Sequence, residues 1–213
     1  NLMKMNAYLT SLIIRKTVIP PVNSTTSDYM RKVRAIESSL VPFQQYVIAM
    51  CKIAINKIVI AEKSVASRVK RSTSNLKDIL SKLKEVLKDI SSVNDYPQVG
   101  WPKLPDLPAD GRKMTIKLRA SVKDDRMRNY RYIRDEAKKN QTKILILREA
   151  LNKFTVSVSS SRKVGNQAQL IADIITALLN IDNALTSYIA KLEMAIDALS
   201  KMSAWPPCGK FKN

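Results

Sequence analysis

The chain has 213 residues, which is long enough to bury one sizeable hydrophobic core. Its 37 Lys and Arg residues against 18 Asp and Glu residues give a net charge of +19, and such an excess is typical of proteins that attract polyanions or anionic membranes. Histidine is absent, which excludes Ser-His and Cys-His catalytic pairs, and four glycines are too few for most strand-rich folds.

The first 18 residues predict a short amphipathic helix, whose apolar face carries Leu2, Met5, Leu9, Leu12 and Ile13. Pro20 and Pro21 end this helix because neither ring nitrogen can donate a helical hydrogen bond. The polar residues from 23 to 28 then offer several candidate N-caps for a second helix.

The stretch from Thr25 to Val93 predicts one very long helix. Apolar or small residues recur every three or four positions, with an interruption at Ser72: Tyr29, Val33, Ile36, Leu40, Phe43, Val47, Met50, Ala54, Ile58, Ala61, Val65, Val69, Leu76, Ile79, Leu83, Val86 and Ile90. At 1.5 Å per residue this helix would be roughly 90 Å long, so other helices must pack along it. Pro42 predicts a kink near residues 38–40 or a division into two collinear helices.

Residues 94–112 differ from the rest in composition. Four prolines between Pro97 and Pro108 exclude a helix or a central strand and favour an extended connection. Trp101, Leu104 and Leu107 give this connection apolar side chains at a spacing of three. Two interpretations stay open: the connection packs across the end of a helical bundle, or it is an exposed loop that binds a protein partner.

Two further helices are predicted, from about Lys113 to Val158 and from Asn166 to Ala204, with Gly165 as a stop between them. The apolar face of the first contains Leu118, Val122, Tyr130, Ile133, Ala137, Ile144, Leu147, Leu151, Phe154 and Val158. The second has a coiled-coil-like seam of Ile171, Ile174, Leu178, Ile181, Leu185, Tyr188, Leu192, Ala195, Leu199 and Met202. The fold predicted is an all-α, elongated antiparallel bundle of four to five helices, forming one domain over residues 1–213.

Cys51 and Cys208 predict a disulfide that fixes the C-terminal tail, residues 205–213, to the long helix. The alternative is two unpaired thiols, one buried and one in the tail. A disulfide implies an oxidising compartment, so we expect a secreted protein. The sequons at Asn23 and Asn140 occur about as often as chance predicts, and whether either is glycosylated is left open. The longest uncharged run, Ser38 to Cys51, is too short to span a bilayer.

Basic residues concentrate between Arg112 and Arg148, where 13 Lys and Arg residues face four acids. Helical geometry predicts a solvent-facing row of Lys113, Lys117, Arg128, Arg131, Arg134 and Lys138, with Tyr132 able to stack on a base or sugar. Lys63, Arg68, Lys70 and Arg71 extend this surface if the helices align them. The functional interpretation is a track for an extended polyanion; the alternative is a solvated face whose arginines pair with local acids.

We therefore predict a non-enzymatic, secreted, monomeric protein without cofactor or metal. It captures a sulfated glycan, polyphosphate or extracellular nucleic acid. Two alternatives remain. Long amphipathic helices and a cationic surface also suit a membrane-active, lipid-binding bundle. The proline-rich connection with Trp101, Leu104 and Leu107 also suits an inhibitor that binds a host or partner protein.

Overall fold

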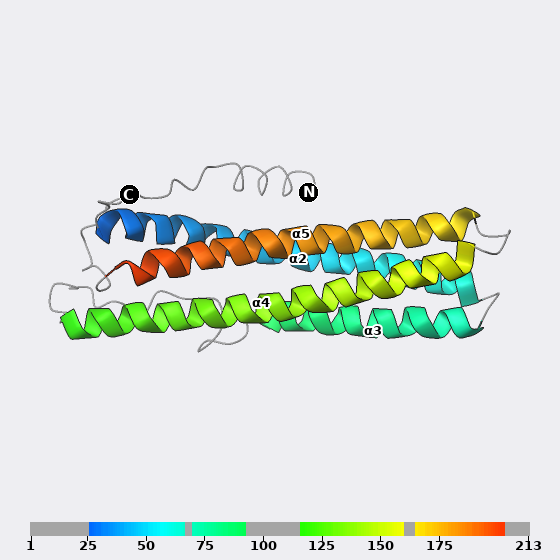
Figure 1. The fold of residues 1–213 in the computed structure, drawn as a ribbon, viewed down its shortest axis with the longest axis horizontal. Helices are drawn as coiled ribbons and strands as arrows, with labels where there is room; N and C mark the ends of the chain where they lie inside the picture. The colour runs from blue at the N-terminus through cyan, green and yellow to red at the C-terminus, as the bar shows by residue number, and fades with distance from the viewer. Residues whose placement is uncertain (1–25, 67–69, 93–115, 160–164, 203–213) are drawn as a thin grey trace. The chain divides into compact units, whose positions relative to one another are not determined.

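The fold is known from a computed structural model, which describes residues 26–66, 70–92, 116–159 and 165–202. Side chains are described for 28–64, 75–92, 119–154 and 168–202. These residues form four helices, α2 (Thr26–Ala66), α3 (Lys70–Ser92), α4 (Ile116–Ser159) and α5 (Gly165–Ser200), and none of them lies in a strand (Figure 1). The all-helical fold class is confirmed.

The helices divide between two compact units, which we describe separately. The first unit contains residues 26–43 of α2, 116–136 of α4 and 187–202 at the end of α5. The second unit contains residues 44–66, all of α3, 137–159 of α4 and 165–186 of α5. The prediction of a single domain stays a prediction.

The apolar periodicity of the sequence forms the core. Every seam residue predicted on α5, from Ile171 to Met202, is buried. The predicted faces of α2 from Val33 to Ala61 and of α3 from Leu76 to Ile90 are buried as well. Helical spacing alone therefore predicted which side of each helix packs against its neighbours.

The single helix predicted from Thr25 to Val93 is wrong, because α2 ends at Ala66 and α3 begins at Lys70. The buried Gln44 side chain donates a hydrogen bond of 2.8 Å to the Ile90 carbonyl oxygen. In a continuous helix these two residues would be about 69 Å apart. Lys77 and Glu62 form a second contact, at 3.8 Å, between the two helices. In the second unit α2 and α3 are therefore antiparallel neighbours.

Pro42 lies inside α2, which continues through it, so the predicted division into two collinear helices is wrong. Pro42 has no N–H to donate to the Ser38 carbonyl. The neighbouring hydroxyls of Ser38 and Ser39 bond back to the carbonyls of Ala35 and Ile36, at 2.8 and 2.7 Å. The predicted kink stays a prediction.

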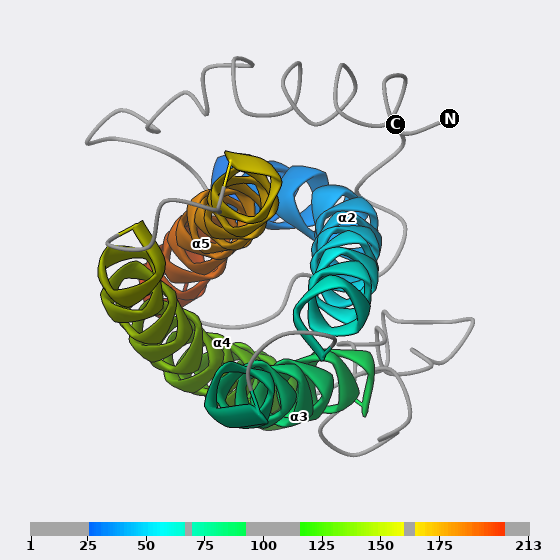
Figure 2. The same cartoon turned by 90° about the vertical axis from the view of Figure 1, so that its right-hand side faces the viewer.

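In the second unit the four helices surround a common core, in the order α2, α3, α4, α5 (Figure 2). The Lys143 ammonium group joins α4 to Asp89 of α3 at 2.8 Å. Gln141 and Arg148 join α4 to Asp182 of α5, and Gln141 also reaches Thr186. Gln141 reaches Thr186, whereas Arg148, later in α4, reaches Asp182, earlier in α5, so these two helices are antiparallel.

The structure does not support the predicted disulfide. Cys51 is a free and fully buried thiol on the core face of α2, and Cys208 lies outside the described residues. Burial raises the pKa of the Cys51 thiol to about 12, so the side chain behaves as a small neutral apolar group. The alternative interpretation of Cys51, a buried unpaired thiol, holds.

Several predictions fall outside the described residues. They are the helix over residues 1–18, the connection 94–112 with Trp101, Leu104 and Leu107, the tail 205–213, and the single residues Asn23, Arg68 and Lys113.

Candidate functional site

The predicted arginine face of α4 lies in the first unit and is partly neutralised. Arg128 is exposed and forms an ion pair of 3.2 Å with Asp125, one turn away. Arg131 is also exposed, and no carboxylate among the described residues pairs with it. Tyr132 is 46% exposed beside it. Arg131 and Tyr132 are therefore the accessible cation and ring of this face.

Arg134 does not face solvent as predicted. Its side chain is 25% exposed, and its Nε lies 3.0 Å from Asp135. At 100° per residue it lies about 80° from the centre of the buried stripe, on the flank of the helix rather than opposite the core. Lys117 belongs to α4, although its side chain is not described, and Lys138 is exposed in the second unit.

The second predicted cluster does not meet Lys138. Lys63 is exposed near the end of α2, and Lys70 and Arg71 begin α3. Lys77 of α3 contacts Glu62 of α2, so this part of α3 lies beside the end of α2 that carries Lys63. Asp89, which pairs with Lys143 of α4, lies 12 residues further along α3. That separation is about 18 Å. Lys138 precedes Lys143 on α4 and lies further still from Lys63.

A different row of cations is present on the outer face of α3. Lys77, Lys84 and Lys88 are exposed, and their positions fall within about 40° of one another around the helix. They are separated along the axis by about 10 Å and about 6 Å. Lys84 and Lys88 contact no carboxylate in the described part of the chain. These three lysines are hereafter called the α3 lysine row.

A buried polar cluster occupies the first unit. The Arg126 side chain is 1% exposed, and its Nε lies 3.5 Å from Glu37 Oε1 across the α2–α4 contact. The buried Tyr130 hydroxyl donates a short hydrogen bond to the same carboxylate oxygen. Burial raises the pKa of Glu37, although Arg126, Tyr130 and Arg34 act in the opposite direction. The cluster ties α2 to α4 and is not available to a polyanion.

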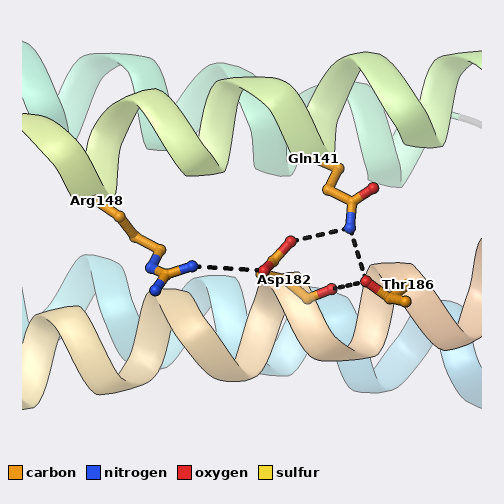
Figure 3. A network of polar contacts seen from close by, with 4 residues as sticks. All are labelled: Gln141, Arg148, Asp182 and Thr186. Atoms are coloured by element: carbon orange, nitrogen blue, oxygen red, sulfur yellow. Dashed lines mark hydrogen bonds and ion pairs between the residues drawn. The ribbon is translucent and has the colours of Figure 1, made fainter.

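A polar network joins α4 to α5 in the second unit (Figure 3). The Gln141 amide donates to Asp182 at 2.9 Å and to the Thr186 hydroxyl at 2.7 Å. Arg148 reaches the other Asp182 oxygen at 3.5 Å. In Figure 3 Asp182 lies between the two α4 side chains, which fixes the register of α4 against α5.

Sequence reasoning missed two buried polar residues of α4. The predicted apolar face of this helix jumps from Val122 to Tyr130 and from Ala137 to Ile144. Arg126 and Asn140 fill these gaps and are 2% and 3% exposed. The alternating spacing of four and three was the available signal, since both residues fall on it. Burial of Asn140 also removes its amide from a glycosylating enzyme once the protein has folded.

Metal and membrane signals are limited in the described residues. No group of three or more Cys, Asp or Glu side chains could hold a metal ion there. Asp28–Ser64 and Ala168–Ser200 are long and apolar enough to cross a membrane, with a mean hydropathy of 1.2 and 39% of each apolar window buried. Core helices of soluble proteins share these properties.

Comparison of the chain with known protein families, with curated proteins and with solved structures finds no match. The function must therefore be argued from the residues themselves.

Proposed function

We propose that this chain is a non-enzymatic protein that captures an extended polyanion, with its helices forming an elongated antiparallel bundle. Secretion, which was inferred from the disulfide, stays a prediction. The observation that supports this most is the α3 lysine row, in which Lys84 and Lys88 have no carboxylate partner among the described residues. Lys and Arg outnumber Asp and Glu by 17 to 7 in the sequence of the second unit, so the row belongs to a strongly positive surface.

The spacing of the α3 lysine row favours a linear ligand with regularly repeated charge. Lys84 and Lys88, about 6 Å apart along the helix, can each approach a different sulfate or phosphate group, and Lys77, about 10 Å before Lys84, can do so in exchange for its 3.8 Å pair with Glu62. Lysine acts as a point charge and imposes no fixed geometry, so this row selects charge density rather than sequence. Heparan sulfate and polyphosphate fit this description.

Arg131 and Tyr132 offer a second contact face in the first unit. This face would distinguish nucleic acid from a glycan or polyphosphate. An exposed tyrosine beside an unpaired arginine can stack on a nucleobase, which a glycan or polyphosphate does not have. Tyr132→Ala should weaken binding to single-stranded nucleic acid and leave heparin binding unchanged. Equal loss for every ligand would contradict a stacking role for Tyr132.

The experiment compares retention of the protein on heparin, long-chain polyphosphate and single-stranded RNA over a salt series. We expect retention that survives physiological salt on at least one polymer and falls steeply above it, because binding releases condensed counterions. The variant Lys84→Gln/Lys88→Gln should elute at lower salt. Its control is Lys52→Gln/Lys153→Gln, which removes the same charge from exposed positions on α2 and α4 of the same unit.

A second candidate is a membrane-active bundle, which the apolar windows of α2 and α5 favour. Release of dye from vesicles with anionic lipid, with no retention on heparin, would support it over polyanion capture. The third candidate, an inhibitor that acts through residues 99–107, concerns residues outside the described structure. Salt-insensitive binding of one protein, lost when that segment is replaced, would support it.

A further inference from the structure

The exposed residues of α5 in the second unit are uncharged, and the half-buried Asp173 lies at their edge. Between positions 168 and 186 they are Gln169, Ala172, Thr176, Leu179, Asn180, Asn183 and Thr186. The two acids in this stretch are half-buried, and each is hydrogen bonded: Asp173 accepts from Gln169 at 2.9 Å, and Asp182 belongs to the network with α4. This absence of charge is unusual in a chain with 26% charged residues.

The neighbouring helix adds apolar surface to this face. Leu145 and Ile146 of α4 are 42% and 54% exposed, and Leu179 of α5 is 38% exposed. Leu145 lies in sequence between Gln141 and Arg148, the two residues that contact Asp182, and on the same flank of α4, so it adjoins the α5 face at the level of Asp182. Ile146 lies about 100° further around α4, nearer the side on which Lys143 contacts α3, so we call Leu145 and the seven α5 residues the neutral face.

The other three helices of the second unit all expose cations. Lys52 and Lys63 are exposed on α2, the lysine row on α3, and Lys153 on α4. A second copy of this chain carries the same charge of +19, and like charges placed opposite one another at an interface are costly. Two copies can therefore approach with least repulsion at the neutral face.

The composition of the neutral face suits another helix better than a membrane. Helices that bind membranes in the interfacial plane have Lys and Arg beside a bulky apolar stripe. The neutral face instead combines two leucine side chains, Leu179 and the adjoining Leu145, with Ala, Thr and Asn, which allow a helix to approach closely. Its α5 part is also symmetric about the midpoint between Ala177 and Leu178: antiparallel pairing places Gln169 opposite the partner's Thr186, Ala172 opposite the partner's Asn183, and Thr176 opposite the partner's Leu179.

We propose that two copies of this protein associate through the neutral face, with their α5 helices antiparallel about a twofold axis between Ala177 and Leu178. Residues 169–186 span about 26 Å of helix, so the contact between two copies covers only a short length of each. We therefore expect a weak dimer that dissociates on dilution. This differs from the monomer predicted from sequence, because composition alone did not reveal that one helix face lacks exposed charge. The proposal does not depend on polyanion binding.

The test is sedimentation equilibrium of the full chain, free of nucleic acid and under reducing conditions, at several protein and salt concentrations. We expect reversible dimerisation that strengthens with salt, since screening reduces the repulsion between two copies of charge +19. Leu179→Glu and Thr176→Glu should each weaken the dimer at least tenfold. Gln45→Glu, at an exposed position of α2 in the same unit, should not.

Circular dichroism and thermal unfolding must show that each variant is folded, which is expected because both substituted side chains are exposed. A wild-type chain that stays monomeric at every concentration would overturn the proposal. A dimer that persists in both glutamate variants would also overturn it. A dimer that dissociates as salt rises would overturn it as well, because that dependence indicates bridging by a polyanion. If the wild type is monomeric and binds vesicles, and both glutamate variants lose that binding, the neutral face contacts a membrane instead of a second copy.

Discussion

Arg126 Nε lies 3.5 Å from Glu37 Oε1, and the Arg126 side chain is 1% exposed. An arginine from the most basic helix of the chain is thus directed into the first unit and paired with a carboxylate of α2. Breaking a buried pair by removing one partner leaves an uncompensated charge, whereas replacing both partners with apolar groups is often neutral. The pair therefore offers a clear test of how the first unit is held together.

Arg126→Met should destabilise the protein by about 3 kcal/mol, because Glu37 then remains buried opposite no guanidinium group. The double variant Glu37→Leu/Arg126→Met should recover most of this loss. Chemical denaturation of the wild type, both single variants and the double variant gives the coupling free energy. Additive effects of the two substitutions would contradict the direct pairing.

The stability of the protein should depend on pH through Glu37. Burial raises the folded-state pKa of this carboxyl above its ordinary value of 4.5. The protonated form is therefore favoured in the folded state, and the contribution of Glu37 to stability is complete below pH 4.5 and declines as pH rises through the folded-state pKa. Relative to the wild type, Glu37→Gln should become progressively more stable as pH increases from 4.5. The unfolding free energies of both proteins over a pH series measure this, and a constant difference would exclude the shift.

Cys51 should not react in the folded protein. Its thiol is buried and its pKa is raised to about 12, so the reactive thiolate is scarce at neutral pH. In a Cys208→Ser variant, a chromogenic thiol reagent should modify Cys51 only after denaturant is added. Rapid modification without denaturant would place Cys51 at the surface and contradict the core packing of α2.

Asp182 should matter more to stability than an exposed acid of the same helix. It accepts hydrogen bonds from Gln141 and Arg148, and its side chain is 17% exposed. Asp182→Ala should cost about 1–3 kcal/mol, because two α4 side chains lose their acceptor. Asp197→Ala is the matched control, since its pair with Lys201 is surface-exposed and screened by solvent, and its loss should cost less. Equal losses of unfolding free energy in the two variants would show that the network of Figure 3 stabilises the protein no more than a surface ion pair does.

Helical spacing predicted the buried faces well, because burial of an apolar stripe is a local property of the helix. The same spacing could not show that the chain reverses between Ala66 and Lys70, since a stripe records which side is buried and not the direction of the helix. Gln44 and Ile90, 46 residues apart in sequence, meet only because of that reversal.

The candidate site was predicted less well, because charge counts do not show where a side chain points. Arg126 belongs to the same basic segment as Arg131, yet one is buried against Glu37 and the other is exposed. Arg134 lies on a helix flank beside Asp135. Lys84 and Lys88 were not selected from sequence, although the apolar stripe from Leu76 to Ile90 already placed them on the solvent-facing side of the helix.

The most direct test of polyanion capture is the slope of log K against log salt concentration for heparin binding. The wild type should show a steep negative slope, and Lys84→Gln/Lys88→Gln should reduce its magnitude by about two, one unit for each lost contact. Lys52→Gln/Lys153→Gln, with the same net charge, should keep the wild-type slope. Identical slopes for the two variants, or wild-type affinity that does not change with salt, would contradict the proposed role of the α3 lysine row.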